Sequence, residues 1–487
     1  MSPFTYPPKN AILSPDMSTI KFGTDGWRGI IADDFTFGNV RLVAQATADY
    51  ILAHGNNNKK VVVGFDTRFM GADFAGIITS VLTGNNLTVF LSKEPTPTPS
   101  VSLAVLEQKA AGGVMVTASH NPPKYSGFKF KGPYGGAAFP TMTSEVEKLL
   151  GRTPVKEMAI KEAQKQGLLL IGDLKENHRK KASGYVDFSN IRKYGFRIVA
   201  DTMHGAGFGY LPKLFQGSKT RVDTLHENPD PTFCGVAPEP KEANLSELKK
   251  EVRRKKADLG FATDGDADRI GLVDDKGRFV GAQLILSLLC LHLARYRKMT
   301  GGVVCTVGTT LQLERIAKNL ALPVYHTPIG FKYVTELMLE KDVIIGGEES
   351  GGVGVKNYFP ERDGLVACLL ILEMMMVNKK SLSRLIADME KEFGKFVYDR
   401  RDASFPVEMR EKMIKTLIDR NLKFLIGRKV SRIDTTDGIK FLLDPPGWLL
   451  LRGSGTEPIL RIYAETESAV DTKKLLEEGY QLAGSVL

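Results

Sequence analysis

Three stretches of this chain repeat one order of elements, and this repetition constrains the fold more than any other feature of the sequence. Each stretch opens with a short β-branched run, a small-residue turn and a helix-like segment, at residues 59–68, 196–205 and 301–310. A second apolar run follows at 87–91, 220–225 and 322–327, and a third run then ends in a polar, Gly-containing loop. The pattern is typical of βα units. It predicts three related α/β modules, each with a loop at the carboxyl edge of its sheet, where open α/β sheets bind ligands.

The C-terminal part, from about Glu392, differs from the three modules. Gly447–Glu465 holds two strand-like runs around a Gly-containing turn, and an amphipathic helix pattern begins at Ser468. We therefore predict a four-domain α/β protein, in which three related α/β modules with mixed sheets precede a smaller α+β domain with an antiparallel sheet. The predicted boundaries are a flexible N-terminal extension at 1–19 and domains at 20–168, 169–280, 281–391 and 392–487.

The composition favours an anionic ligand. Lys and Arg exceed Asp and Glu by 66 to 56, which gives a net charge of +10 and suits phosphorylated metabolites. The basic residues are scattered and no zinc-finger spacing appears, so we expect no nucleic-acid partner. The cysteines form no CxxC pair, which fits a reducing compartment. The N-terminus has prolines where a signal peptide needs an apolar run. The longest apolar stretches are shorter than the ~20 residues of a membrane span. We expect a cytoplasmic protein without a membrane partner.

The loop TDGDADR (Thr263–Arg269) concentrates acid. Asp264, Asp266 and Asp268 alternate, so an extended loop can turn all three carboxylates toward one point. A divalent, oxygen-seeking cation, most simply Mg²⁺, would relieve their mutual repulsion. An EF-hand is excluded because its sixth and twelfth positions would be Arg269 and Asp275 instead of Gly and Glu. An acidic surface turn would give the same spacing.

Two further loops carry polar groups suited to a sugar phosphate. RGSGTEP (Arg452–Pro458) offers the guanidinium fork of Arg452, two hydroxyls, and glycines that let backbone N–H groups approach a phosphate. It lacks the lysine of a nucleotide P-loop. GGEESGG (Gly346–Gly352) places Glu348 and Ser350 two apart, where both can face sugar hydroxyls. Either loop read alone is also compatible with an ordinary turn.

The motifs TASHNP, DGDADR, GEESGG and RGSGTEP, in this order, resemble those of the α-D-phosphohexomutase superfamily, which includes phosphoglucomutases and phosphomannomutases. The resemblance extends from Lys21 to about Glu465. It implies four domains around a central cleft, three of one α/β topology and a fourth of another type.

The resemblance also implies the roles of individual residues. Ser119 would be carried as phosphoserine, with His120, Lys129 and Arg28 as the other catalytic residues. Mg²⁺ would be held by Ser119, Asp264, Asp266 and Asp268. Hexose 1-phosphate and hexose 6-phosphate would interconvert through a hexose 1,6-bisphosphate, which is both intermediate and activator. The substrate-binding residues would be Arg269, Lys332, Glu348, Ser350, Arg452, Ser454, Gly455 and Thr456.

The choice of sugar rests on smaller resemblances. TPIGFKY, GEESGG and ERDG (with Arg362) are similar to glucose-type members, and Gly352 stands where dual-specificity members have His. We therefore expect glucose phosphates to be preferred, with some mannose activity, in a monomer or homodimer. Three alternatives stay open: a phosphoglucosamine mutase or a glucose 1,6-bisphosphate synthase of the same family, a Mg²⁺-dependent sugar-phosphate phosphatase, and a non-catalytic sugar-phosphate-binding protein.

Overall fold

The computed structural model describes residues 20–55, 57–453 and 458–486. The chain divides into two compact units. Unit 1 holds the described residues up to Gly281 together with Gly351–Ser383, and unit 2 holds Ala282–Ser350 together with the described residues from Arg384 onward. The predicted extension at 1–19 lies outside the described residues. Within the described ranges, none of the helices is long and apolar enough to cross a membrane.

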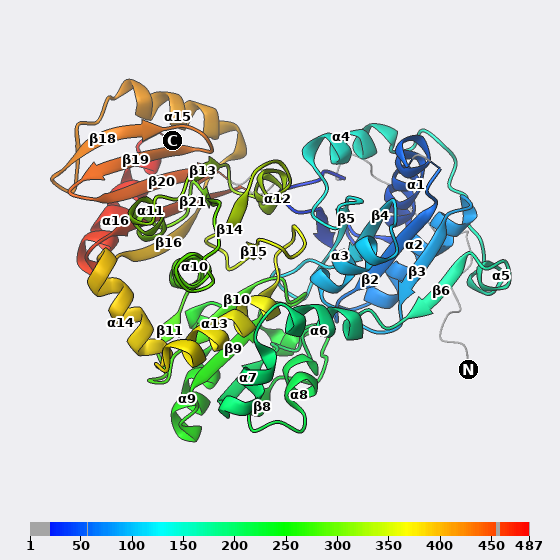
Figure 1. Cartoon of the computed structure of the whole chain (residues 1–487). Helices are drawn as coiled ribbons and strands as arrows, with labels where there is room; N and C mark the ends of the chain where they lie inside the picture. Colours follow the sequence, from blue (N-terminus) through cyan, green and yellow to red (C-terminus); the bar gives the residue numbers. More distant parts are fainter. Residues whose placement is uncertain (1–19, 56, 454–457, 487) are drawn as a thin grey trace. The chain divides into compact units, whose positions relative to one another are not determined.

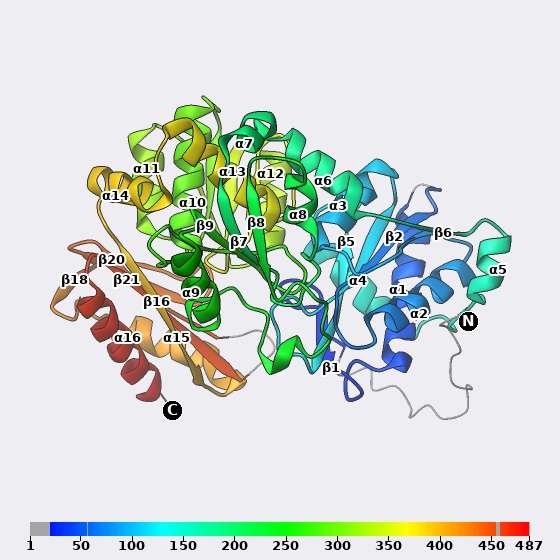
Figure 2. The ribbon, with the colours of Figure 1, turned by 90° about the horizontal axis from the view of Figure 1, so that it is seen from below.

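The first module of unit 1 is a mixed sheet with helices on both faces (Figure 1). Its strands are β1 (Trp27–Ile30), β2 (Lys60–Phe65), β3 (Thr88–Ser92), β4 (Gly112–Val116), β5 (Tyr125–Lys131) and β6 (Leu169–Gly172), and its helices are α1 (Phe37–His54), α2 (Gly71–Gly84), α3 (Thr98–Glu107), α4 (Pro140–Leu149) and α5 (Ile160–Lys165). Because side chains alternate along a strand, Val61 and Val63 pack in the core under α1 and α2, while Val62 packs under α3 on the opposite face (Figure 2). Strand β6 begins directly after residue 168 and still belongs to this sheet.

The second module of unit 1 repeats the strand order of the first. Its elements are β7 (Arg197–Asp201), β8 (Arg221–Leu225), β9 (Leu259–Thr263), β10 (Ile270–Val273), β11 (Phe279–Val280), α6 (Lys175–Gly184), α7 (Phe188–Tyr194), α8 (Tyr210–Phe215) and α9 (Ser246–Lys255), with 3₁₀ turns at Phe233–Gly235 and Glu242–Asn244. Strand β7 pairs in parallel with β8 and β9 and an antiparallel β10 follows β9, just as β2 pairs with β3 and β4 and β5 follows β4.

A buried polar network ties the segment Gly351–Ser383 to both modules of unit 1. The segment contains β15 (Val353–Val355) and α13 (Gly364–Asn378). Asp363 caps α13 and its Oδ2 lies 2.6 Å from Nε2 of His178 on α6. The hydroxyl of Tyr210 lies 2.8 Å from His178 Nδ1 and 2.6 Å from Ser100 Oγ on α3. Ser100, His178 and Asp363 are at most 1% exposed, and their hydrogen bonds join α3, α6 and the start of α13, so this serine–histidine–aspartate arrangement ties three segments of unit 1 together.

Unit 2 begins with the third module. Its elements are β12 (Gly302–Thr306), β13 (Val324–Thr327), β14 (Val343–Gly347), α10 (Ala282–Leu291), a π turn (His292–Tyr296), α11 (Leu311–Asn319) and α12 (Phe331–Glu340), and α14 (Leu382–Phe393) follows later in the chain. Strand β12 pairs in parallel with β13 and β14. The third run of each repeat therefore lies beside the first run, and the prediction of three related modules is confirmed.

The C-terminal part of unit 2 is an antiparallel sheet, as predicted. Its strands are β16 (Val397–Ser404), β17 (Phe424–Leu425), β18 (Arg428–Asp434), β19 (Ile439–Asp444), β20 (Gly447–Gly453) and β21 (Ile459–Thr466), with a 3₁₀ turn at Val407–Met409 and helices α15 (Arg410–Asp419) and α16 (Ala469–Gly484). Helix α16, red in Figure 1, packs on β16, β20 and β21. Trp448, Leu450 and Tyr463 pack against Val307 and Ile329 of the third module, which joins the two parts of unit 2.

Candidate active site

Ser119 lies in the loop that follows β4, in a strained backbone conformation. Its φ is +54°, the left-handed region that residues other than Gly rarely adopt. The Ser119 N–H donates to Thr117 Oγ1 at 2.8 Å, and its carbonyl accepts from Arg68 Nη2 at 2.7 Å. The residue is fully buried. The backbone of Ser119 is therefore fixed by hydrogen bonds from both sides of its peptide group.

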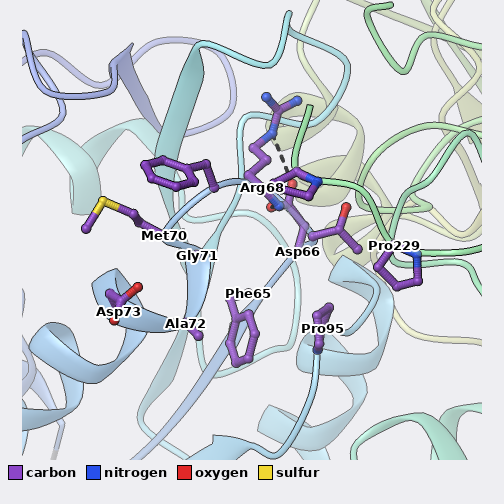
Figure 3. A pocket seen from close by; sticks show the side chains of 12 residues that line it. Phe65, Asp66, Arg68, Met70, Gly71, Ala72, Asp73, Pro95 and Pro229 are labelled. Carbon is purple, nitrogen blue, oxygen red and sulfur yellow. Dashed lines mark hydrogen bonds and ion pairs between the residues drawn. The ribbon is translucent and has the colours of Figure 1, made fainter. Parts of the chain in front are cut away.

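Arg68, which the sequence motifs did not single out, is the support of this loop. Its guanidinium also donates to the carbonyls of Asn121, Pro122 and Tyr125 at 2.7–2.9 Å. Asp66 accepts from Arg68 Nε at 3.1 Å and from the Thr117 hydroxyl at 2.6 Å. Burial raises the pKa of Asp66 to about 6, although Arg68 opposes the shift. Figure 3 shows both side chains at the pocket formed by the β2–α2 turn.

The three aspartates lie in the loop after β9, and unit 1 brings them to Ser119. The Ser119 hydroxyl donates to Asp264 Oδ2 at 2.7 Å. A Cβ added to Gly265 would lie 2.6 Å from the Ser119 carbonyl oxygen, so the two loops meet at a distance that only Gly permits. Thr98 is the first residue of α3, and its hydroxyl donates to Asp266 Oδ2 at 2.5 Å. We call Ser119 and the three aspartates the serine–aspartate site.

Lys129 on β5 is the main cation of the serine–aspartate site. Its Nζ lies 2.8 Å from Asp266 Oδ2, 2.9 Å from Asp268 Oδ2 and 2.8 Å from Asp25 Oδ2. Burial lowers the pKa of Lys129, but these three carboxylates outweigh it and the pKa is raised. Lys129 is therefore protonated near neutral pH, which suits charge balance better than proton abstraction.

The carboxylates themselves divide into two kinds. Burial, followed by repulsion from Asp266 and Asp268, raises the pKa of Asp264 well above its usual range. Burial also raises the pKa of Asp266, but Lys129 outweighs it and the net shift is downward. The ionised form of Asp264 is thus less stabilised than that of Asp266, because Asp264 faces the serine and not the lysine.

The serine–aspartate site fits a divalent cation. One oxygen of each of the three carboxylates lies within 4.8 Å of the others, and all three residues are fully buried. Asp266 Oδ1 and Asp268 Oδ1 have no hydrogen-bond partner among the residues that the structure describes. Buried carboxylate oxygens that lack a donor are ligands for a hard ion such as Mg²⁺.

The remaining predicted residues of unit 1 surround this site. Arg28 Nη1 donates to Asn121 Oδ1 at 2.5 Å, next to the serine loop. Arg269 Nε lies 3.9 Å from oxygens of both Asp264 and Asp268. His120 Nδ1 lies 3.5 Å from the Ser119 hydroxyl, farther than Asp264.

Arg362 is a second cation at the site, and Gly352 makes room for it. Its Nη2 lies 2.5 Å from Asp25 Oδ2 and 2.7 Å from Asp268 Oδ2. A Cβ added to Gly352 would lie 2.1 Å from Arg362 Cδ. The sequence drew attention to both residues only through the resemblance to glucose-type members, whereas the structure links them physically.

Unit 2 holds the predicted sugar-binding residues at the carboxyl edge of its parallel sheet. Glu348 and Ser350 follow β14, and Lys332 lies in the first turn of α12, after β13. Glu348 is buried. The adjacent Glu349 turns back toward Thr306 at 3.4 Å. The loops that follow β13 and β14 leave the same edge because both strands run parallel to β12.

The predicted phosphate residue Arg452 lies at the end of β20 and is fixed by Asp437. Asp437 Oδ2 accepts from Arg452 Nε at 2.7 Å and from the Ile329 N–H at 2.9 Å. Asp437 therefore couples the arginine to the Thr327–Lys332 segment of the third module. Burial and then the charge of Arg452 lower the pKa of Arg410, so two guanidinium groups share this region, which favours an anion. Ser454, Gly455 and Thr456 lie outside the described residues.

Comparisons with known proteins agree on one family. Models of the phosphoglucomutase/phosphomannomutase family match in order: α/β/α domain I at 19–155, domain II at 176–277, domain III at 282–393 and the C-terminal domain at 398–481. A phosphoglucomutase/phosphomannomutase of Thermococcus kodakarensis is 32% identical over 96% of this chain and 99% of its own. A protein of Pyrococcus horikoshii named as a probable phosphoglucosamine mutase is 32% identical over 96% of this chain and 98% of its own. The crystal structure of a Thermus thermophilus protein, provisionally named a phosphomannomutase, matches with a TM-score of 0.84 and 35% identity. The match covers 96% of this chain and 99% of that protein.

Proposed function

Because the chain belongs to the phosphoglucomutase/phosphomannomutase family of intramolecular phosphotransferases, we propose that it interconverts hexose 1-phosphate and hexose 6-phosphate through phosphorylated Ser119. The observation that carries the proposal is the Ser119 hydroxyl, buried and 2.7 Å from Asp264 beside two carboxylate oxygens that lack a donor. A hydroxyl in that setting is placed to carry a phosphoryl group and a counter-ion together.

The reaction would proceed in two transfers. The free hydroxyl of hexose 1-phosphate attacks the phosphorus of phospho-Ser119, the bond between phosphorus and the serine oxygen breaks, and the proton of the sugar hydroxyl is transferred, overall, to the departing serine oxygen. The resulting hexose 1,6-bisphosphate reorients and returns its other phosphoryl group to Ser119, which gives hexose 6-phosphate. Two hydrogen bonds keep the serine loop in place through both transfers: Arg68 donates to the Ser119 carbonyl, and the Ser119 N–H donates to Thr117 Oγ1.

Asp264, Asp266 and Asp268 would hold Mg²⁺ together with an oxygen of the phosphorylated serine. When bound, this ion supplies charge neutralisation at the transferring phosphoryl group. Lys129 and Arg28 add fixed positive charge, with His120 as an assistant near the serine oxygen. Lys129 already contacts Asp266 and Asp268, and Arg28 already contacts Asn121. These two side chains therefore need little reorganisation during the reaction.

The other residues divide the binding of the substrate. Arg452, with Ser454, Gly455 and Thr456, would grip the phosphate that does not react, while Glu348, Ser350 and Lys332 hold sugar hydroxyls and Arg269 lies by the transferring group. On this proposal the phosphoserine belongs to residues 20–168, the metal loop to 169–280, the sugar loop to 281–391 and the phosphate loop to 392–487. The reaction would take place in the cytoplasm, where the free cysteines stay reduced.

We propose glucose phosphates as the preferred substrates, with some activity toward mannose phosphates. The support is the glucose-type form of GEESGG and ERDG, and the Arg362 side chain that fills the space next to Gly352. A phosphoglucosamine mutase is the second candidate, because several relatives at about one-third identity carry that name.

Assays with glucose, mannose and glucosamine 1-phosphates separate these candidates by their kcat/KM values. Each assay is run with and without added 1,6-bisphosphate. Accumulation of free bisphosphate would instead indicate a bisphosphate synthase, and release of inorganic phosphate without isomerisation would indicate a phosphatase.

Intact-mass measurement of the purified protein, followed by peptide mapping, tests the phosphoenzyme directly. We expect one phosphate on Ser119, and we expect Ser119→Ala to lower mutase turnover by about 10³-fold or more. Ser126→Ala is the matched control, since Ser126 is another fully buried serine of the same module. A phosphate on another residue, or full activity of Ser119→Ala, contradicts the mechanism.

A further inference from the structure

His204, Asp230 and Cys234 bring an imidazole, a carboxylate and a thiol together outside the serine–aspartate site. Their ligand atoms lie within 4.8 Å of one another. His204 lies in the loop after β7, whereas Asp230 and Cys234 lie in the loop after β8. Because β7 and β8 are parallel neighbours, the two loops leave the same edge of the sheet.

The distances in this cluster match those between the ligands of one zinc ion. His204 Nε2 lies 3.2 Å from Cys234 Sγ, and Sγ lies 3.4 Å from Asp230 Oδ2. Ligand atoms bound at about 2.0–2.3 Å around a tetrahedral Zn²⁺ lie about 3.3–3.7 Å from each other. Little rearrangement would bring the three atoms onto one ion.

His204 already has the orientation of a metal ligand. Its Nδ1 lies 2.8 Å from the carbonyl oxygen of Asn228. A carbonyl only accepts, so Nδ1 carries a proton, and in the neutral imidazole the lone pair of Nε2 then faces the thiol. Metal-bound histidines are commonly held by the same contact from the second ring nitrogen to a carbonyl.

The thiol of Cys234 has two polar neighbours and one proton. Cys234 has a single S–H proton, but its sulfur faces the acceptor nitrogen of His204 and the carboxylate of Asp230. A metal ion that replaces this proton would bind all three groups at once.

The backbone provides an independent indication. His204 has a φ of +60° and Cys234 a φ of +51°, both in the left-handed region. The neighbouring Met203 and Phe233 adopt this conformation as well, with a φ of +48° each. Strained residues of this kind collect where a functional arrangement requires them.

We propose that His204, Asp230 and Cys234 form a binding site for one divalent transition-metal ion of the Zn²⁺ type, with water as the fourth ligand. The mixed nitrogen, oxygen and sulfur set favours such an ion over Mg²⁺, which suits the all-carboxylate set of the serine–aspartate site. The site does not depend on the proposed sugar substrate.

Metal binding would stiffen the loop that covers Arg68. The Phe233 ring lies 5.0 Å from the Arg68 guanidinium. Pro229 and Pro231 of the same loop line a pocket together with Arg68, and Figure 3 labels Pro229 and Arg68 among the residues that line it. Since Arg68 holds the Ser119 carbonyl, an ion at Cys234 would steady the support of the serine loop.

Titration of the metal-free, reduced, full-length protein with Zn²⁺ tests this proposal. Saturating Mg²⁺ is included to occupy the serine–aspartate site. We expect one Zn²⁺ per chain, with affinity at least tenfold lower in His204→Ala and Cys234→Gly. Cys234→Gly is the most informative variant because Gly accepts a φ of +51° without strain and the fold is kept.

Glu227→Gln, in the same loop, leaves the three ligands in place and should keep the wild-type affinity. With Co²⁺ as the probe, a thiolate-to-metal charge-transfer band should appear in the wild type and be absent from Cys234→Gly. Equal Zn²⁺ affinity of the wild type and Cys234→Gly, or a Co²⁺ complex without the thiolate band, overturns the assignment.

Discussion

At the scale of single residues, the serine–aspartate site shows how charge is arranged before any substrate arrives. Asp25 lies within contact distance of both Lys129 and Arg362. Burial raises the pKa of Asp25, but Arg362 and then Lys129 outweigh it and hold the pKa well below the usual range. Two cations are thereby fixed next to the three aspartates, although Asp25 belongs to none of the motifs that identified the site.

Gly352 offers a test of this arrangement. In Gly352→Ala, the new Cβ would displace Arg362, whose stem is buried and whose guanidinium is engaged by Asp25 and Asp268. We expect a loss of stability of about 1–3 kcal/mol from overpacking, together with a lower kcat. Thermal unfolding and steady-state kinetics measure the two effects.

Gly184→Ala is the matched control, because a Cβ at that position at the end of α6 meets nothing within 4 Å. Wild-type Tm and kcat in Gly352→Ala would show that Arg362 can move at no cost, against the packing described above.

Asp437 supports a second test, aimed at a positioning residue. Asp437→Ala removes the acceptor that fixes Arg452 and the Ile329 N–H. We expect KM for the sugar phosphate to rise about tenfold, or ~1.4 kcal/mol of binding, with a smaller change in kcat because the serine–aspartate site is untouched.

The control for Asp437 is Asp434→Ala. Asp434 belongs to the same hairpin, and its carboxylate accepts hydrogen bonds from Thr436. An unchanged KM in Asp437→Ala, or an equal rise in both variants, would mean that Asp437 does not orient Arg452.

At the scale of elements, the sequence was most informative where periodicity and strand order agree. The three predicted repeats correspond to β2–β4, β7–β9 and β12–β14, and in each the third strand lies next to the first. The loops with Ser119, Asp264 and Glu348 each follow a third strand. This correspondence could be predicted because apolar runs and the loops between them are local properties of a sequence.

The contacts that orient these loops could not be predicted in the same way. Arg68 lies far from Ser119 in the chain, and an Arg after a strand looks like an ordinary surface cation until the carbonyls around it are seen. Asp437 falls in a plain hairpin turn, and its two partners belong to other elements. Long-range polar pairs leave no periodic signal, so only the fold reveals them.

The joint between α11 and the C-terminal sheet provides a pH-dependent test. Glu465 on β21 accepts from the Leu311 N–H at 2.8 Å and from Trp448 Nε1 at 3.2 Å. Burial raises its pKa from 4.5 to about 7. The folded state thus holds a proton that the unfolded state loses above about pH 4.5, so stability falls as the pH rises from there through about 7.

Glu465→Gln keeps an acceptor for both donors but does not titrate. We expect this variant to show a flatter dependence of the free energy of unfolding on pH, and to exceed the wild type by about 3 kcal/mol at pH 8. Glu467→Gln, an exposed acid two residues along, is the control. Parallel pH profiles for Glu465→Gln and the wild type would contradict the shift.

At the scale of the whole molecule, part of the excess of basic residues is concentrated at two places. The net charge of +10 predicted an anionic ligand, and the structure gathers cations at two places, one in each unit. One is the serine–aspartate site, with Lys129, Arg28 and Arg362. The other is Arg452 with Arg410.

Unit 1 is built from two separate lengths of chain, and this has a consequence for the order of synthesis. His178 leaves the ribosome long before Asp363, the carboxylate that it contacts in the folded protein. Chains generally begin to fold from the N-terminus while they are made. The His178 imidazole therefore lacks its Asp363 partner while all of Ala282–Ser350 is translated. The nascent protein therefore completes unit 1 only after Ser383 has emerged, although the main core of its first module, from Ile20 to Leu169, is synthesised before His178.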